Sequence, residues 1–117
     1  MKAWRVHEFG PYRDALVWED CPDPELPSPD SSVIDVHAAG VNFPDILFIQ
    51  GEYQIKPPLP FVPGKELAGV VTALGDGVTD LKIGDRVMGQ LESGAFAEAV
   101  VGLALDEPPH RRKIVGT

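Results

Sequence analysis

Cysteine and positive charge are both scarce in this 117-residue chain. The single cysteine, Cys21, excludes an intrachain disulfide and any metal site built from several cysteines. Ten basic residues stand against 18 acidic ones, and the formal net charge is −8. Nucleic acids and anionic membranes bind to basic surfaces. We therefore predict no nucleic-acid partner and no membrane partner.

Long apolar runs are missing as well. No stretch approaches the ~18 apolar residues that would span a bilayer, and residues 1–5 do not begin the apolar core of a signal peptide. These features predict a cytoplasmic protein. The one basic cluster, residues 111–113, is typical of a surface tail and not of a nucleic-acid patch.

Glycine and proline are plentiful, with 12 residues each, which suits a β-rich chain with many turns. The pattern of apolar residues predicts strands over residues 1–9, 15–18, 33–39, 67–74, 87–88 and 95–101. Four prolines within residues 21–29 exclude a central strand there and indicate an extended connector. The expected fold class is mainly β.

One short helix is predicted near residues 43–50. Asn42 offers a capping side chain, Pro44 suits the first helical turn, and Asp45 places a negative charge at the positive end of the helix dipole. Gly51 can end the helix. From these residues alone, a cap with a dipole-matched acid is the favoured interpretation of Asn42 and Asp45.

Two further motifs have ordinary structural interpretations. Residues 75–77, Gly-Asp-Gly, begin like a dinucleotide loop, but the third glycine and the following helix are missing, so a hairpin turn is predicted. Lys65 and Glu66 follow a proline–glycine turn, where an exposed ion pair is the simplest expectation.

Five blocks of sequence, taken together, give these residues a second interpretation. They are GVNFPD at 40–45, GEY at 51–53, PFVPGKELAGVV at 60–71, GDRV at 84–87 and GAFAE at 94–98. In order and spacing they resemble the N-terminal, GroES-like catalytic domain of the medium-chain dehydrogenase/reductase superfamily. The resemblance covers about residues 1–105 and implies a GroES-like, partly open β-barrel with one short helix. Residues 106–117 are expected to form an atypical tail, and the Rossmann NAD(P)-binding domain is expected to be absent.

The superfamily's alcohol dehydrogenases hold a catalytic zinc through a cysteine and a histidine. This chain has Asn42 at the position of the cysteine and Lys65 at that of the histidine. An amide and an ammonium group do not replace a thiolate and an imidazole as zinc ligands. The four-cysteine lobe that carries the structural zinc is also missing, because Cys21 is alone. The chain thus resembles the zinc-free quinone oxidoreductase branch, which implies no zinc.

Members of that branch pass a hydride from NADPH to a quinone or an activated enone. Without a metal, the oxygen that receives negative charge needs hydrogen-bond donors. The resemblance implies Asn42 and Tyr53 as catalytic residues, with Asn42 also at the cofactor. Asp45 and Glu66 are expected to hold the helix and the following strand in position, while Lys65 adds positive charge near the cleft.

Two functions remain open at this point. The first is the substrate-side domain of an NADPH-dependent quinone or enone oxidoreductase, expected to be inactive as this isolated chain because the nucleotide-binding domain is not encoded. The second is a non-catalytic GroES-like binding or assembly module. The faces that a nucleotide domain would cover are expected to be exposed, which predicts a homo-oligomer or association through that surface.

Overall fold

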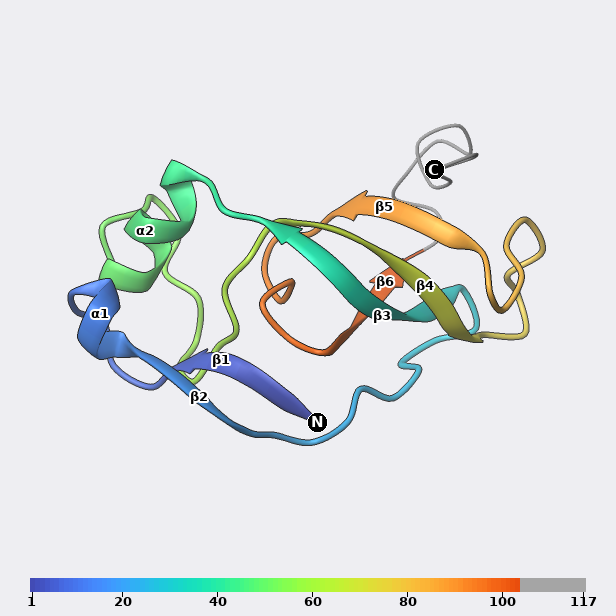
Figure 1. Cartoon of the computed structure of the whole chain (residues 1–117), viewed down its shortest axis with the longest axis horizontal. Helices are drawn as coiled ribbons and strands as arrows, with labels where there is room; N and C mark the ends of the chain where they lie inside the picture. Colours follow the sequence, from blue (N-terminus) through green and yellow to red (C-terminus); the bar gives the residue numbers. More distant parts are fainter. Residues whose placement is uncertain (104–117) are drawn as a thin grey trace.

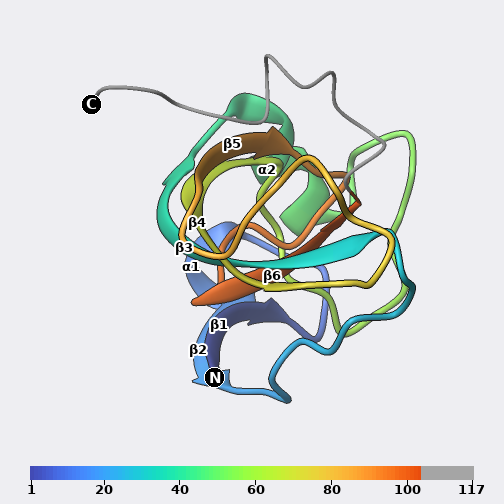
Figure 2. The same cartoon turned by 90° about the vertical axis from the view of Figure 1, so that its right-hand side faces the viewer.

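The computed structural model describes residues 1–103 of the chain. In chain order the elements are β1 (Lys2–Val6), α1 (Tyr12–Ala15), β2 (Leu16–Asp20), β3 (Ser31–Gly40), α2 (Phe43–Gln50), β4 (Glu66–Leu74), β5 (Arg86–Gln90) and β6 (Ala99–Leu103). β1 and β2 form an antiparallel hairpin, and the larger sheet has the order β5-β4-β3-β6 (Figure 1). The turned view shows the hairpin as a separate layer below the larger sheet (Figure 2). The prediction of a mainly β fold is confirmed.

The last strand begins later than the sequence pattern predicts, at Ala99 instead of residue 95. The residues before it pair with other segments of the chain. Ala95 N–H donates to the Gly64 carbonyl at 3.1 Å, and Ala97 forms an isolated bridge with Ala3. The alternating pattern therefore continues through residues that connect the two sheets. The predicted domain boundary at residue 105 and the tail at 106–117 lie outside the described residues.

The prediction of a single helix is wrong, because α1 is a second one. Its one turn is held by the Pro11 carbonyl, which accepts from the N–H groups of Asp14 and Ala15, both at 2.9 Å. Four residues are too few to display a helical period in the sequence. Neither helix of residues 1–103 is long and apolar enough to cross a membrane.

Two apolar clusters fill the interior. The first lies within the larger sheet and its connections and contains Ile34, Leu67, Val71, Leu81, Val87, Ala95 and Val100. The second lies beneath α2, where the Phe48 ring meets the rings of Phe61 and Tyr53 edge-on at centroid distances of 5.6 and 5.3 Å. Such aromatic pairs add to the burial of α2. The second cluster therefore holds α2 against Val6 of β1 and against Phe61.

β3 and β4 approach each other closely at Gly69. A Cβ atom at this position would lie 2.0 Å from the carbonyl oxygen of Asp35, on the facing strand. Backbone cannot move aside as a flexible side chain can. Glycine is therefore required where these two central strands cross the core.

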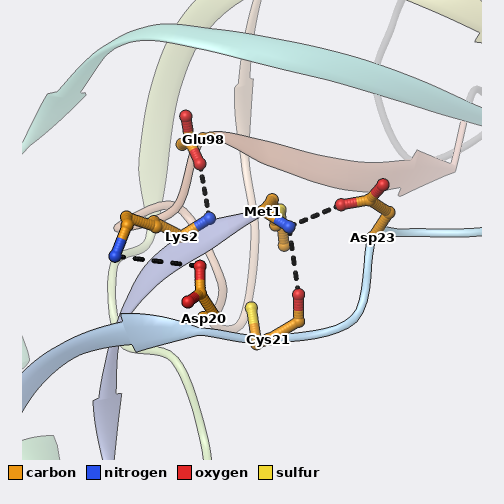
Figure 3. A network of polar contacts seen from close by, with 6 residues as sticks. All are labelled: Met1, Lys2, Asp20, Cys21, Asp23 and Glu98. Carbon is orange, nitrogen blue, oxygen red and sulfur yellow. Dashed lines mark hydrogen bonds and ion pairs between the residues drawn. The ribbon is translucent and has the colours of Figure 1, made fainter.

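The amino terminus is tied into the hairpin by polar contacts (Figure 3). The Met1 ammonium group donates to Asp23 Oδ1 at 2.6 Å and to the Cys21 carbonyl at 3.1 Å. The hydrogen bond to Asp23 raises the pKa of the terminal amino group above its ordinary value of 8.0. The next residue, Lys2, donates its N–H to the carboxylate of Glu98. These contacts join the hairpin to the segment that leads into β6.

Candidate functional site

The beginning of α2 carries most of the residues that the sequence blocks single out. Asn42 is the N-cap residue, and its backbone N–H donates to Asp45 Oδ2 at 2.7 Å. The Asp45 side chain is only 1% exposed. Gly51, in the left-handed region at φ 73°, ends the helix. Asn42 occupies the predicted N-cap position, and the capping hydrogen bond is the one that the Asp45 carboxylate accepts from the Asn42 backbone N–H.

The side chain of Asn42 makes a contact that the capping interpretation does not include. Its Nδ2 donates to Glu66 Oε1 at 2.5 Å. Glu66 is the first residue of β4 and pairs with Gly40, the last residue of β3. A Cβ at Gly40 would lie 2.6 Å from Glu66 Oε1 and 2.9 Å from its Cγ. The missing side chain of Gly40 thus leaves the space through which Glu66 reaches Asn42.

Lys65 and Tyr53 come together around Phe48 of α2. The Lys65 ammonium lies 4.0 Å from the centroid of the Phe48 ring and 5.2 Å from that of the Tyr53 ring. It also donates to the Glu92 carbonyl at 2.8 Å. The cation therefore lies over two aromatic faces, a favourable arrangement, instead of forming the exposed ion pair with Glu66 that the sequence suggested.

The five predicted site residues thus form two adjoining groups. Direct hydrogen bonds join Asn42 to Asp45 and to Glu66, while ring contacts join Tyr53 to Lys65. The groups adjoin because Lys65 and Glu66 are neighbours in the chain. The sequence did not identify Gly40 and Phe48 as residues of this site. The role of Gly40 depends on Glu66 in the facing strand β4, and in the sequence Phe48 is one of several consecutive apolar residues.

The arrangement offers hydrogen-bond donors, not a cluster of metal ligands. Within residues 1–103, no three His, Cys, Asp or Glu side chains are grouped to hold a metal ion. The two positions that hold zinc ligands in the alcohol dehydrogenases are engaged elsewhere. The Asn42 amide binds Glu66, and the Lys65 ammonium lies over the ring of Phe48.

Comparison with known proteins agrees with this architecture. Residues 28–104 match the alcohol dehydrogenase GroES-like domain family, and the chain belongs to that family. The relatives that the chain resembles include proteins named quinone oxidoreductase-like protein 2, synaptic vesicle membrane protein VAT-1 homolog and alcohol dehydrogenase. Quinone oxidoreductase-like protein 2 from Mus musculus is 47% identical over 78 residues, which are 67% of this chain and 22% of that protein.

Solved structures of oxidoreductases share the fold. A probable oxidoreductase from Mycobacterium abscessus is 40% identical with a TM-score of 0.81, over 97% of this chain and 34% of that one. The Escherichia coli quinone oxidoreductase, solved with NADPH, is 30% identical with a TM-score of 0.81, over 89% of this chain and 31% of that enzyme. The chain therefore spans about a quarter to a third of the length of these relatives.

Proposed function

We propose that this chain supplies the substrate side of a zinc-independent, NADPH-dependent oxidoreductase that reduces quinones or enones. The observation that carries the proposal is the Asn42 amide, held by Glu66 at the exposed beginning of α2. Similarity to quinone oxidoreductases, one of them solved with NADPH, supports the choice of substrate and cofactor.

Asn42 is proposed to stabilise the oxygen that becomes negative when a quinone or enone accepts a hydride. An amide nitrogen carries two N–H donors. Glu66 takes one of them and fixes the plane of the amide, which leaves the second N–H for the substrate oxygen. Tyr53 is proposed as the second donor, because it carries a hydroxyl group and its ring is positioned by an edge contact with Phe48 and by the Lys65 ammonium.

NADPH, when bound, would supply the hydride. The residues around Asn42 fit the nicotinamide end of this cofactor, because Val41 and Phe43 on either side are 76% and 70% exposed and offer an apolar surface to a flat ring. No glycine-rich loop leads into a helix within residues 1–103. The turn at 75–77 instead follows β4, and Gly77 N–H donates to the Pro29 carbonyl. We therefore propose that the chain does not turn over NADPH by itself.

Three further parts of the proposal concern zinc, the location of the protein in the cell and the association of copies of the chain. The amide of Asn42 and the ammonium of Lys65 are unsuited to zinc. We also propose a cytoplasmic location, where a thiol such as Cys21 stays reduced. Association of copies is supported by the exposed side chains of Val41 and Phe43, and a monomer at every concentration in sedimentation would contradict it.

A chimera tests the role of Asn42. Residues 1–103 would replace the matching part of the Escherichia coli quinone oxidoreductase, and NADPH oxidation by 1,2-naphthoquinone would be measured. Asn42→Ala should lower kcat about 10²-fold, the usual effect of removing one oxyanion donor, while Gln54→Ala at an exposed position nearby serves as the control.

Two results would contradict the proposal. Full activity of the Asn42→Ala chimera would show that the amide has no catalytic part. Turnover of NADPH by the unmodified 117-residue chain would show that it needs no second domain. A chimera that folds and binds NADPH without reducing quinones would favour the non-catalytic assembly module.

A further inference from the structure

Lys65 is a cation at the candidate site without an acidic partner among residues 1–103. Its ammonium group donates to the Glu92 carbonyl at 2.8 Å. Its other contacts are with two ring faces, those of Phe48 and Tyr53, whose centroids lie 4.0 and 5.2 Å away. In the described part of the chain, no aspartate or glutamate carboxylate forms an ion pair with it. The positive charge is therefore held by neutral groups.

Partial burial makes the missing counter-charge significant. The other lysines of residues 1–103 are exposed, so water solvates their charge. Lys65 is half-buried, and a cation that has lost part of its hydration is stabilised by an opposite charge. Arg5 is the other half-buried basic side chain of this region, and it has such a partner in Glu19 at 3.5 Å. Lys65 has ring faces in that place, which compensate for only part of the lost hydration.

The ammonium group also has donors to spare. It carries three N–H donors and no acceptor, and the Glu92 carbonyl takes one of them. Anionic oxygens accept from an ammonium group more strongly than neutral carbonyls do. A ligand with an anionic oxygen would thus supply both the charge and the acceptors that Lys65 lacks.

The position of Lys65 links it to the two donors of the proposed reaction. Its ammonium lies over the ring of Tyr53, and the next residue in the chain, Glu66, holds the amide of Asn42. A carbonyl oxygen bound by Asn42 and Tyr53 already receives hydrogen bonds from both. The charge of Lys65 is then left for a second group on the same ligand.

We propose that Lys65 selects quinones or enones that carry a fixed anionic group, such as a carboxylate. This inference rests on the proposed function, because Asn42 and Tyr53 are taken to receive the carbonyl oxygen. The net charge of the chain is −8, which disfavours the approach of an anion to most of its surface. Lys65 gives this one place the opposite preference.

Binding of two anthraquinones to the full 117-residue chain tests the inference. Anthraquinone-2-sulfonate has a fixed negative charge, and anthraquinone-2-sulfonamide is its neutral counterpart. Titrations followed by the backbone amide resonances should show the sulfonate bound about 5-fold more tightly, the effect of one ion pair at a partly exposed site. Added salt should weaken this preference, because it screens the charges.

Three variants assign the preference to Lys65. Lys65→Met should bind both compounds equally, and an unchanged dissociation constant for the sulfonamide would show that the variant is folded. Lys65→Arg keeps the charge and should keep the preference. Lys56→Met removes a cation that lies 6.0 Å from the centroid of another ring, that of Phe9, and should behave like the wild type.

Equal affinity of the wild type for the two compounds would overturn the inference. A preference that persists in Lys65→Met would overturn it as well, and so would the absence of binding by either compound. These titrations involve no NADPH and no turnover, whereas the chimera measures the role of Asn42 with a neutral quinone. A failure of this inference is therefore distinguishable from a failure of the proposed oxidoreductase function.

Discussion

Replacing Gly40 by alanine should break the hydrogen bond between Asn42 and Glu66, although neither partner is changed. The added Cβ would lie 2.6 Å from Glu66 Oε1 and 2.9 Å from both Cδ and Cγ. Moving the carboxylate tip alone does not relieve these contacts, because Cγ is involved as well. The whole side chain must turn away, and its 2.5 Å contact with Asn42 Nδ2 is then lost.

The expected free energies follow from two opposing effects. A hydrogen bond to a charged group contributes about 1.5–3 kcal/mol. Because Asn42 is exposed and Glu66 half-buried, we take about 1 kcal/mol for this bond. Exchange of glycine for alanine at a compatible position stabilises by about 0.4–1 kcal/mol through the unfolded state. Gly40→Ala alone should therefore change the free energy of unfolding by less than about 1 kcal/mol.

A double-mutant cycle separates these effects. In a Glu66→Ala background, the three atoms nearest to the added Cβ are gone, so Gly40→Ala should stabilise the protein by about 0.4–1 kcal/mol. Urea unfolding of the four proteins gives the coupling energy, and the side-chain amide resonances of Asn42 report on the bond itself. If Gly40→Ala has the same effect with and without Glu66, the steric reasoning is wrong. Retention of the wild-type Asn42 amide resonances in Gly40→Ala would refute it equally.

Three further perturbations test the fold. Gly69→Ala should lower the free energy of unfolding by more than about 3 kcal/mol, since its Cβ would meet backbone at 2.0 Å; Gly89→Ala, with open space around it, is the control in urea unfolding. The pKa of the N-terminal ammonium is raised in the folded state, so this group stabilises the fold below pH 8 and loses the effect as pH rises through the folded pKa. In Asp23→Asn, the free energy of unfolding should therefore fall less between pH 7 and pH 10 than it does in the wild type. Lys65→Met keeps the side-chain stem and removes the cation over the aromatic rings, so unfolding should become easier by about 0.5–1 kcal/mol, and an unchanged urea midpoint would contradict this.

Much of the fold follows from local patterns in the sequence. The buried strand predicted over residues 67–74 is β4, and the helix predicted near residues 43–50 is α2, ending at Gly51 as expected. Both rest on short-range features, a continuous apolar run and a set of helix-terminal residues. The predictions that were wrong concern segments without such local features or with long-range partners. α1 is too short to show a period, and residues 95–98 alternate like a strand but pair with loops and with β1.

The candidate site is less predictable, because its contacts join segments far apart in the chain. The sequence blocks identify Asn42, Lys65 and Glu66 as residues of interest, but their partners depend on where the beginning of α2 and the beginning of β4 lie in the fold. Neither the bond from Asn42 to Glu66 nor the placement of Lys65 over the Phe48 ring can be inferred from spacing. Each of these pairs is more than 15 residues apart in the sequence.

The register of β3 against β4 controls this site. Gly40 lies directly opposite Glu66 in the ladder, and two bulges, at Val33/Ile34 and Val36/Ala38, set that alignment. A slip of one residue would turn Glu66 to the other face of the sheet and carry its carboxylate away from Asn42. The same slip would remove the buried side chains of β4 from the core, which makes it costly. The apolar core therefore fixes the orientation of an exposed amide at the beginning of α2. Substitutions in the β3–β4 core should disturb the Asn42–Glu66 bond without touching it.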